Sequence, residues 1–140
     1  MTIRTLVIFL IISIFFKPVF AKTQYFQEGL NLFNNKKFSE ARFKFEQDIV
    51  FNPKSEMSYL YLAKIFKNLD KKKLAEQNLN TVILLNPTNE EAIYSLARLK
   101  LEASDYIKSK ELNEKLINFC NLFCNESKKL KNEIENLSKK

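Results

Sequence analysis

Two cysteines near the carboxyl end are the residues of this 140-residue chain whose type and spacing suggest covalent chemistry. Cys120 and Cys124 lie four positions apart, and the chain contains no histidine. A structural metal site needs about four ligands, so two cysteines make metal binding a very weak interpretation. A redox pair more often has the Cys-x-x-Cys spacing beside a β-α-β pattern, which is absent here. We expect a Cys120–Cys124 disulfide, because two cysteines in an exported protein usually pair. The alternatives are two buried free thiols and, more weakly, a redox pair.

The rest of the sequence contains no catalytic set. The absence of histidine excludes Ser-His and Cys-His nucleophile pairs, and the single glycine excludes a glycine-rich phosphate loop. The adjacent acids Glu90 and Glu91 are better explained as part of a helix start and a solvated face. The formal net charge is +7, but lysines and acids are interleaved and no aromatic-basic sheet motif occurs. We therefore predict a non-enzymatic protein with no cofactor, no metal and no nucleic-acid partner.

The composition and an internal repeat predict the secondary structure of the chain, including the helices that flank the cysteines. One glycine and three prolines indicate long helices joined by short turns, in one domain. A 34-residue unit occurs twice without a gap, over residues 22–55 and 56–89. Each unit has an aromatic residue at position 4, a small residue at position 8, alanine at position 20 and proline at position 32. These residues are Tyr25, Gly29, Ala41 and Pro53 in the first unit, and Tyr59, Ala63, Ala75 and Pro87 in the second.

This pattern resembles the tetratricopeptide repeat (TPR), a helix–turn–helix unit of 34 residues. A less regular third unit over residues 90–123 keeps Ala97 at position 8, has Ser109 in place of the alanine and lacks the proline. The resemblance implies an all-α solenoid with helices at about 22–34, 38–51, 56–69, 72–85, 90–102 and 106–119. The alanines at position 20 would let the two helices of a unit approach closely.

Residues 124–140 are predicted to form a capping helix. Leu130, Ile134 and Leu137 fall on one helical face, and the other faces are charged. A solenoid must cover its last open face, which such a helix would do. The alternative is a frayed charged tail. A Cys120–Cys124 bridge would require the preceding helix to end between the cysteines, because side chains four apart in a helix are poorly aimed at each other.

Residues 1–21 have the composition of a secretory signal peptide. Arg4 gives the positive start, residues 6–16 are almost wholly apolar, and small residues precede a cleavage site after Ala21. Eleven helical residues span about 16 Å, well short of a hydrocarbon core of about 30 Å. We therefore expect export, into the periplasm of a bacterium, with Lys22 as the new amino terminus. The alternative is an uncleaved segment that anchors the protein to the membrane.

The resemblance also implies an interaction surface. In tetratricopeptide repeats the first helix of each unit lines a concave groove that takes peptides or helices of partner proteins. Positions 2, 5, 9, 12 and 13 of each unit would face that groove. Among them, positions 5, 9 and 12 give an apolar line, with an exposed apolar patch in the first unit and a basic row beside it. The apolar residues are Phe26, Leu30, Phe33, Leu60 and Tyr94, and the basic residues are Lys64, Lys67 and Arg98.

The function predicted from these observations is a protein-interaction module of the cell envelope that binds a partner segment in the concave groove. The expected partner segment has acidic residues beside large apolar ones. One alternative is a structural subunit of an envelope assembly, with the apolar patch as a permanent interface. Another is a membrane-anchored scaffold that keeps its first 21 residues. Contact with a membrane is expected only if that segment is not cleaved.

Overall fold

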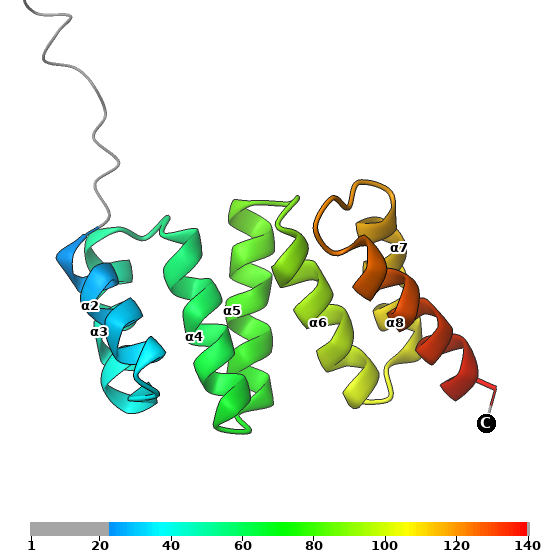
Figure 1. Cartoon of the computed structure of the whole chain (residues 1–140), viewed down its shortest axis with the longest axis horizontal. Coiled ribbons are helices and arrows are strands. Elements are labelled where there is room, and N and C mark those ends of the chain that lie inside the picture. The colour runs from blue at the N-terminus through cyan, green and yellow to red at the C-terminus, as the bar shows by residue number, and fades with distance from the viewer. Residues whose placement is uncertain (1–22, 140) are drawn as a thin grey trace, which may run out of the picture.

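The computed structural model describes residues 23–139, which form seven helices and no strand. The helices pack against one another in chain order, and the helix pairs follow one another in a row from the amino-terminal pair to α8 (Figure 1). The expected all-α solenoid is therefore confirmed, whereas the signal segment at 1–21 lies outside the described residues. The helices are α2 (Gln24–Asn34), α3 (Phe38–Phe51), α4 (Glu56–Asn68), α5 (Lys72–Leu85), α6 (Glu90–Glu102), α7 (Tyr106–Ile117) and α8 (Cys124–Leu137).

The same turn joins the two helices of every pair. Position 15 of each unit has a positive φ, at Lys36 (59°), Asp70 (54°) and Ser104 (60°). In each turn the backbone N–H after this residue donates to a carbonyl five residues earlier, which is the Schellman ending of a helix. The donor and acceptor pairs are Lys37 and Leu32 (2.9 Å), Lys71 and Phe66 (2.8 Å), and Asp105 and Lys100 (2.9 Å). The recurrence of this turn at one position supports the 34-residue register.

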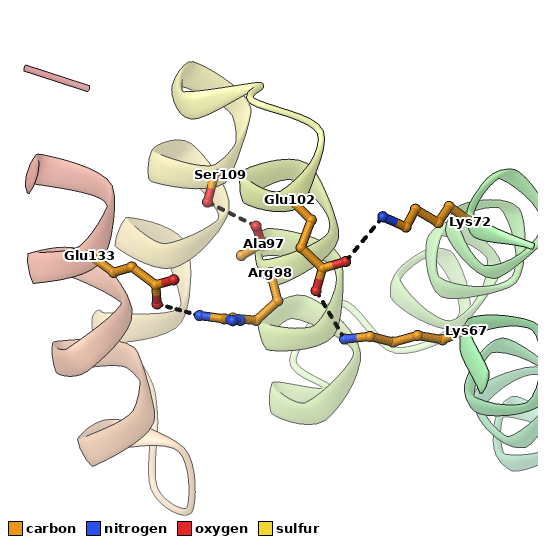
Figure 2. Close-up of polar contacts among 7 residues, drawn as sticks. All are labelled: Lys67, Lys72, Ala97, Arg98, Glu102, Ser109 and Glu133. Carbon is orange, nitrogen blue, oxygen red and sulfur yellow. Dashed lines mark hydrogen bonds and ion pairs between the residues drawn. The ribbon is translucent and has the colours of Figure 1, made fainter. Parts of the chain in front are cut away.

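Small residues allow the two helices of each pair to approach closely. Ala41 and Ala75 are both buried in the core. In the first pair, a Cβ placed on Gly29 would lie 2.9–3.1 Å from ring atoms of Phe45. In the third pair, Ser109 takes the alanine position, and its hydroxyl donates to the carbonyl oxygen of Ala97 at 2.8 Å (Figure 2). The hydroxyl is thus satisfied in the core without widening the gap between the helices.

An aromatic cluster holds the first pair against the second. Tyr61 of α4 stacks on Phe45 with ring centroids 5.1 Å apart. It also meets the edge of Phe33 at 5.0 Å and that of Phe26 at 6.1 Å. One side chain of the second repeat therefore contacts three phenylalanines of the first.

The two ends of the solenoid differ from its interior. Positions 3, 7 and 10 of a unit face the preceding helix pair, and in α4 and α6 these residues are buried. The same positions in α2 are polar and are not buried. The interior residues are Ser58, Leu62, Ile65, Ala92, Leu96 and Leu99, and those of α2 are Gln24, Glu28 and Asn31. The open face of α2 is therefore suited to solvent, as in the terminal unit of a repeat array.

Helix α8 covers the other end, as a capping helix was expected to do. Leu130 and Ile134 are buried against the preceding helices. A buried polar pair adds specificity, since the Asn113 amide donates to the Ser127 carbonyl at 3.0 Å and accepts from the Ser127 hydroxyl at 2.7 Å. Among residues 23–139, no helix combines the length and the apolar character needed to cross a membrane.

A disulfide lies at the corner between α7 and α8. The structure joins Cys120 to Cys124, with Cα atoms 5.2 Å apart. Helix α7 ends at Ile117, two residues before the predicted end at Phe119, so both cysteines lie outside α7 and α8 begins at Cys124. Residues 118–123, between the two helices, are thus free of helical geometry, which lets the sulfur atom of Cys120 reach that of Cys124 at the start of α8.

We expect the thiols of the exported protein to resist an alkylating reagent until a reductant is added. Cys120→Ser should lower the free energy of unfolding by about 2 kcal/mol or less, because the closed loop is very short. Intact mass after alkylation, with and without reductant, measures the first effect, and urea unfolding measures the second. Two alkylated thiols in freshly isolated, unreduced protein would contradict this expectation.

Candidate interaction surface

The surface that the resemblance singled out is the inner face, which we define as positions 2, 5, 9, 12 and 13 of α2, α4 and α6. The prediction that position 5 presents an apolar side chain to the groove is wrong in two repeats, because Phe26 and Leu60 are only 3% and 2% exposed. The ring of Phe26 lies 5.7 Å from that of Phe45, within the aromatic cluster. Tyr94 is half-buried, with Phe123 5.4 Å away. Position 5 therefore contributes mainly to the core.

The apolar surface that remains on the inner face belongs mostly to the first repeat junction. Leu30 and Phe33 are half-buried and pack against the core. Phe33 meets the ring of Phe38 at 5.5 Å as well as that of Tyr61. Met57, at position 2 of the second repeat, is 40% exposed. The predicted patch is thus a smaller apolar strip, centred on Leu30 and Met57.

Each predicted cation of the inner face has a carboxylate partner from a later helix. Lys64 pairs with Glu91 at 2.7 Å and also lies 4.9 Å from the centre of the Tyr61 ring. Lys67 and Lys72 both reach Glu102, at 3.5 and 3.7 Å, and Arg98 pairs with Glu133 of α8 (Figure 2). The expected basic row is therefore a row of alternating charges.

These ion pairs connect neighbouring helix pairs but leave the charged side chains partly accessible to a ligand. The side chains of Lys64 and Arg98 are both 31% exposed, and that of Lys67 is 47% exposed. Exposed ion pairs contribute about 0–1 kcal/mol each, so a charged ligand can displace one at low cost. An incoming segment must therefore match both signs of charge, and an acidic segment alone would face the carboxylates.

A hollow of about 290 Å³ opens at the carboxyl end of the inner face, between the start of α6 and the disulfide loop. One carboxylate organises its rim, because Glu90 accepts backbone N–H bonds from Asn121, Leu122 and Phe123 at 2.8–2.9 Å. The bond from Phe123 is the main cause that lowers the pKa of Glu90 below its ordinary value, with smaller contributions from Asn121 and Leu122. Leu122 is largely exposed at this edge. The lining residues are Thr88, Asn89, Glu90, Glu91, Leu122 and Phe123.

We expect Glu90→Gln to loosen the disulfide loop in a pH-dependent manner. A lowered folded-state pKa means that the carboxylate stabilises the fold above its ordinary pKa of 4.5, and that this contribution is lost as the pH falls through the lowered value. The difference in stability between wild type and Glu90→Gln should therefore be present at neutral pH and vanish in acid. Hydrogen exchange of the amides of residues 121–123 should be faster in the variant at neutral pH.

Glu91→Gln is the matched control, because the neighbouring carboxylate pairs with Lys64, whereas the three backbone N–H groups of the loop donate to Glu90. It should leave exchange of these three amides unchanged. Equal exchange in wild type and in Glu90→Gln would show that the carboxylate does not hold the loop.

Sequence analysis did not single out Tyr61, Glu91 or Glu133, which shape this face. It placed Glu102 in the groove at position 13, but without its ion pairs to Lys67 and Lys72. A usable signal was present, because opposite charges recur about one repeat apart, as in Lys67 with Glu102 and Arg98 with Glu133. The position of Tyr61 against the first repeat had no comparable signal, because it depends on how two helix pairs stack.

No protein-family model matches the chain, and no curated protein matches its sequence. Solved structures do match. The Sgt2 TPR domain from Aspergillus fumigatus has a TM-score of 0.72 and 19% identity, over 88% of this chain and 85% of that one. The TPR2B domain of yeast Sti1, in a complex with pHsp70, has a TM-score of 0.73 and 18% identity, over 81% and 95% of the two chains.

The chain has a TPR fold. The same fold is found in the type III secretion chaperone SycD of Yersinia enterocolitica, which was solved with a peptide of the translocator YopD. Its TM-score is 0.73 at 15% identity, over 84% of this chain and 93% of SycD. In this chain α8 packs on α7 and α6, where a solenoid needs its cap.

Proposed function

We propose that this TPR chain is a non-enzymatic protein-interaction module whose inner face binds a segment of a partner protein. The observation that carries the proposal is the match in fold to TPR domains solved with bound peptides, over more than four fifths of the chain. A second support is the composition of the inner face, which presents ion pairs and half-buried apolar side chains on three parallel helices. Such a surface offers both anchoring and orientation to an elongated ligand.

The partner segment that suits this surface carries both signs of charge beside large apolar residues. Its apolar residues would pack on the strip at Leu30 and Met57 and beside Tyr94. Its carboxylates would meet Lys64, Lys67 and Arg98, and its cations would meet the acids with which those residues pair. Apolar anchors are expected to supply most of the affinity, and charges to set orientation and association rate.

A charge swap across one ion pair tests the proposal while keeping the pair. Lys64→Glu combined with Glu91→Lys keeps an ion pair between α4 and α6. It exchanges the positions of the positive and the negative charge on the inner face. With a partner captured by pull-down, the double variant should bind at least tenfold more weakly at low salt, and the loss should shrink at high salt. Titration by calorimetry at two salt concentrations gives the result.

The control swap is Lys110→Glu with Glu114→Lys, an exposed pair on α7 outside the inner face. It should leave affinity unchanged, and circular dichroism should show both double variants folded. Met57→Gln should also weaken binding, with little dependence on salt. If the inner-face variants bind as tightly as wild type while the α7 swap does not, the partner binds the outer helices instead.

We also propose export to a periplasm, which the disulfide supports, since disulfides persist in oxidising compartments. The cleaved protein should begin at Lys22, and intact mass of protein isolated from its native host measures this directly. Full-length protein that fractionates with membranes would favour the alternative of a membrane-anchored scaffold.

A structural subunit of an envelope assembly is the second candidate, and a surface of α3 favours it. Phe43, Val50 and Phe51 of α3 are 57–73% exposed, and such apolar exposure often marks an interface. A permanent complex that survives purification at high salt would support this candidate over reversible peptide binding.

A further inference from the structure

The exposed surface of α3 has a pattern that peptide binding on the inner face does not use. Phe43 is 57% exposed and Val50 is 73% exposed. The two lie seven residues apart, and therefore on one face of the helix. Phe51, which stacks on Tyr25 of α2, lies at the edge of this face. Helix α3 packs against α2 and α4, and these two exposed side chains point away from both.

The exposed face continues on both sides with the spacing of a two-helix seam. Its residues follow one another at alternating steps of three and four, which keeps a row of side chains against a neighbouring helix. The row begins with an acid and ends with a base, which lies in the turn after α3. We call this row the α3 stripe, and its residues are Glu40, Phe43, Gln47, Val50 and Lys54.

The α3 stripe is complementary to itself when a second copy runs in the opposite direction. With Gln47 on a two-fold axis, Glu40 and Lys54 lie seven residues from the axis on opposite sides. Phe43 lies four residues from the axis on one side, and Val50 lies three residues from it on the other. Antiparallel pairing therefore places Phe43 beside Val50 of the second copy. It also places Glu40 beside Lys54 of the second copy, whereas parallel pairing would bring like charges together.

Both charged ends of the stripe are available for such a contact. Glu40 lies 3.8 Å from Lys37, and both side chains are more than half exposed. Exposed ion pairs are weak, so Glu40 can exchange this partner at low cost. Lys54 is exposed and forms no ion pair within residues 23–139.

We propose that two copies of this chain associate through the α3 stripe to form a two-fold symmetric dimer with antiparallel α3 helices. A closed dimer uses the same surface on both copies, which requires a self-complementary surface of this kind. The inner faces lie on α2, α4 and α6, so the dimer would present two of them to partner proteins. The inference does not depend on the proposed function, because self-association requires no partner segment.

Analytical ultracentrifugation over a range of concentrations tests the proposal, on protein purified after expression of the full chain. We expect the wild type to dimerise. Phe43→Gln should raise the dissociation constant at least about tenfold, because the symmetry removes two buried aromatic contacts at once. Ile107→Gln is the matched control, since Ile107 is 77% exposed on α7, outside the stripe. It should leave the dissociation constant unchanged, and circular dichroism should show both variants folded.

Charge reversals test which ends of the stripe meet. Glu40→Lys and Lys54→Glu should each weaken the dimer about tenfold at low salt and less at high salt, because like charges then meet at both ends. The two substitutions together in one chain should restore wild-type association, and so should an equimolar mixture of the two single variants. Along the helix axis these residues lie about 20 Å apart, at about 1.5 Å per residue, so the rescue cannot arise within one chain.

Monomeric wild-type protein at every concentration measured would overturn the proposal. Dimers that Phe43→Gln and Glu40→Lys leave unchanged would also overturn it, because the contact would then lie elsewhere. A monomer whose α3 stripe binds a different protein would contradict it as well. None of these results bears on peptide binding by the inner face, which the swap of Lys64 and Glu91 tests separately.

Discussion

Gly29→Ala should destabilise the protein by about 1–3 kcal/mol, although alanine is the better helix former by about 1 kcal/mol. The cause is the ring of Phe45, three atoms of which lie 2.9–3.1 Å from the position of the new Cβ. That ring is fully buried and is held by Phe26 and Tyr61, so it has little room to move. Urea unfolding followed by circular dichroism measures the change.

The other repeats indicate which second substitution should relieve the clash. Ala63 occupies the same position in the second repeat, where the residue equivalent to Phe45 is the smaller Leu79. Phe45→Leu should therefore reduce the cost of Gly29→Ala, so that the double variant is more stable than the sum of the two single changes predicts. Gln27→Ala, on an exposed face of α2, controls for helix propensity. Strict additivity would show that Gly29 is not needed for the approach of Phe45.

Ala41→Leu and Ala75→Leu should each cost about 1–3 kcal/mol, because both alanines are buried where two helices cross. A leucine there must separate the helices or force neighbouring side chains out of their rotamers. Ala103 is exposed at the end of α6, and Ala103→Leu should have a much smaller effect. Urea unfolding should therefore show a large loss of stability for Ala41→Leu and Ala75→Leu and a small one for Ala103→Leu.

Equal effects at all three alanines would contradict the repeat register. The register places Ala41 and Ala75 where two helices cross, and Ala103 in a turn. A larger effect at Ala103 than at Ala75 would contradict it more strongly. Near-ultraviolet circular dichroism should also report the change at Ala41, because the aromatic cluster lies beside it.

The helices could be predicted from the sequence because their signals are local and repeated. Asn52-Pro53 and Asn86-Pro87 end α3 and α5 in the structure as in the prediction, since the residue before proline disfavours the helical conformation. The third repeat lacks the proline, and there the predicted end of the second helix was two residues late. Among the six repeat helices, the predicted carboxyl end was therefore least accurate where the Asn-Pro pair is missing.

The candidate site was harder to predict because exposure depends on distant residues. Phe26 occupies a groove position by resemblance, yet Tyr61 from the next repeat covers it. The cations were found, but their pairing with acids about a repeat away was not considered, and pairing changes the ligand that the surface suits. The burial of Asp48 in α3 could not be predicted from the sequence, because a single acid in a helix looks like a surface residue until its exposure is known.

The central claim is that the inner face of α2, α4 and α6 holds the partner segment. Hydrogen–deuterium exchange of the protein, alone and with the partner peptide, tests it most directly. We predict slower exchange in α2, α4 and α6, and unchanged exchange in the exposed amides of α3, α5 and α7. Protection confined to α3, α5 and α7, with the inner helices unchanged, would contradict the claim.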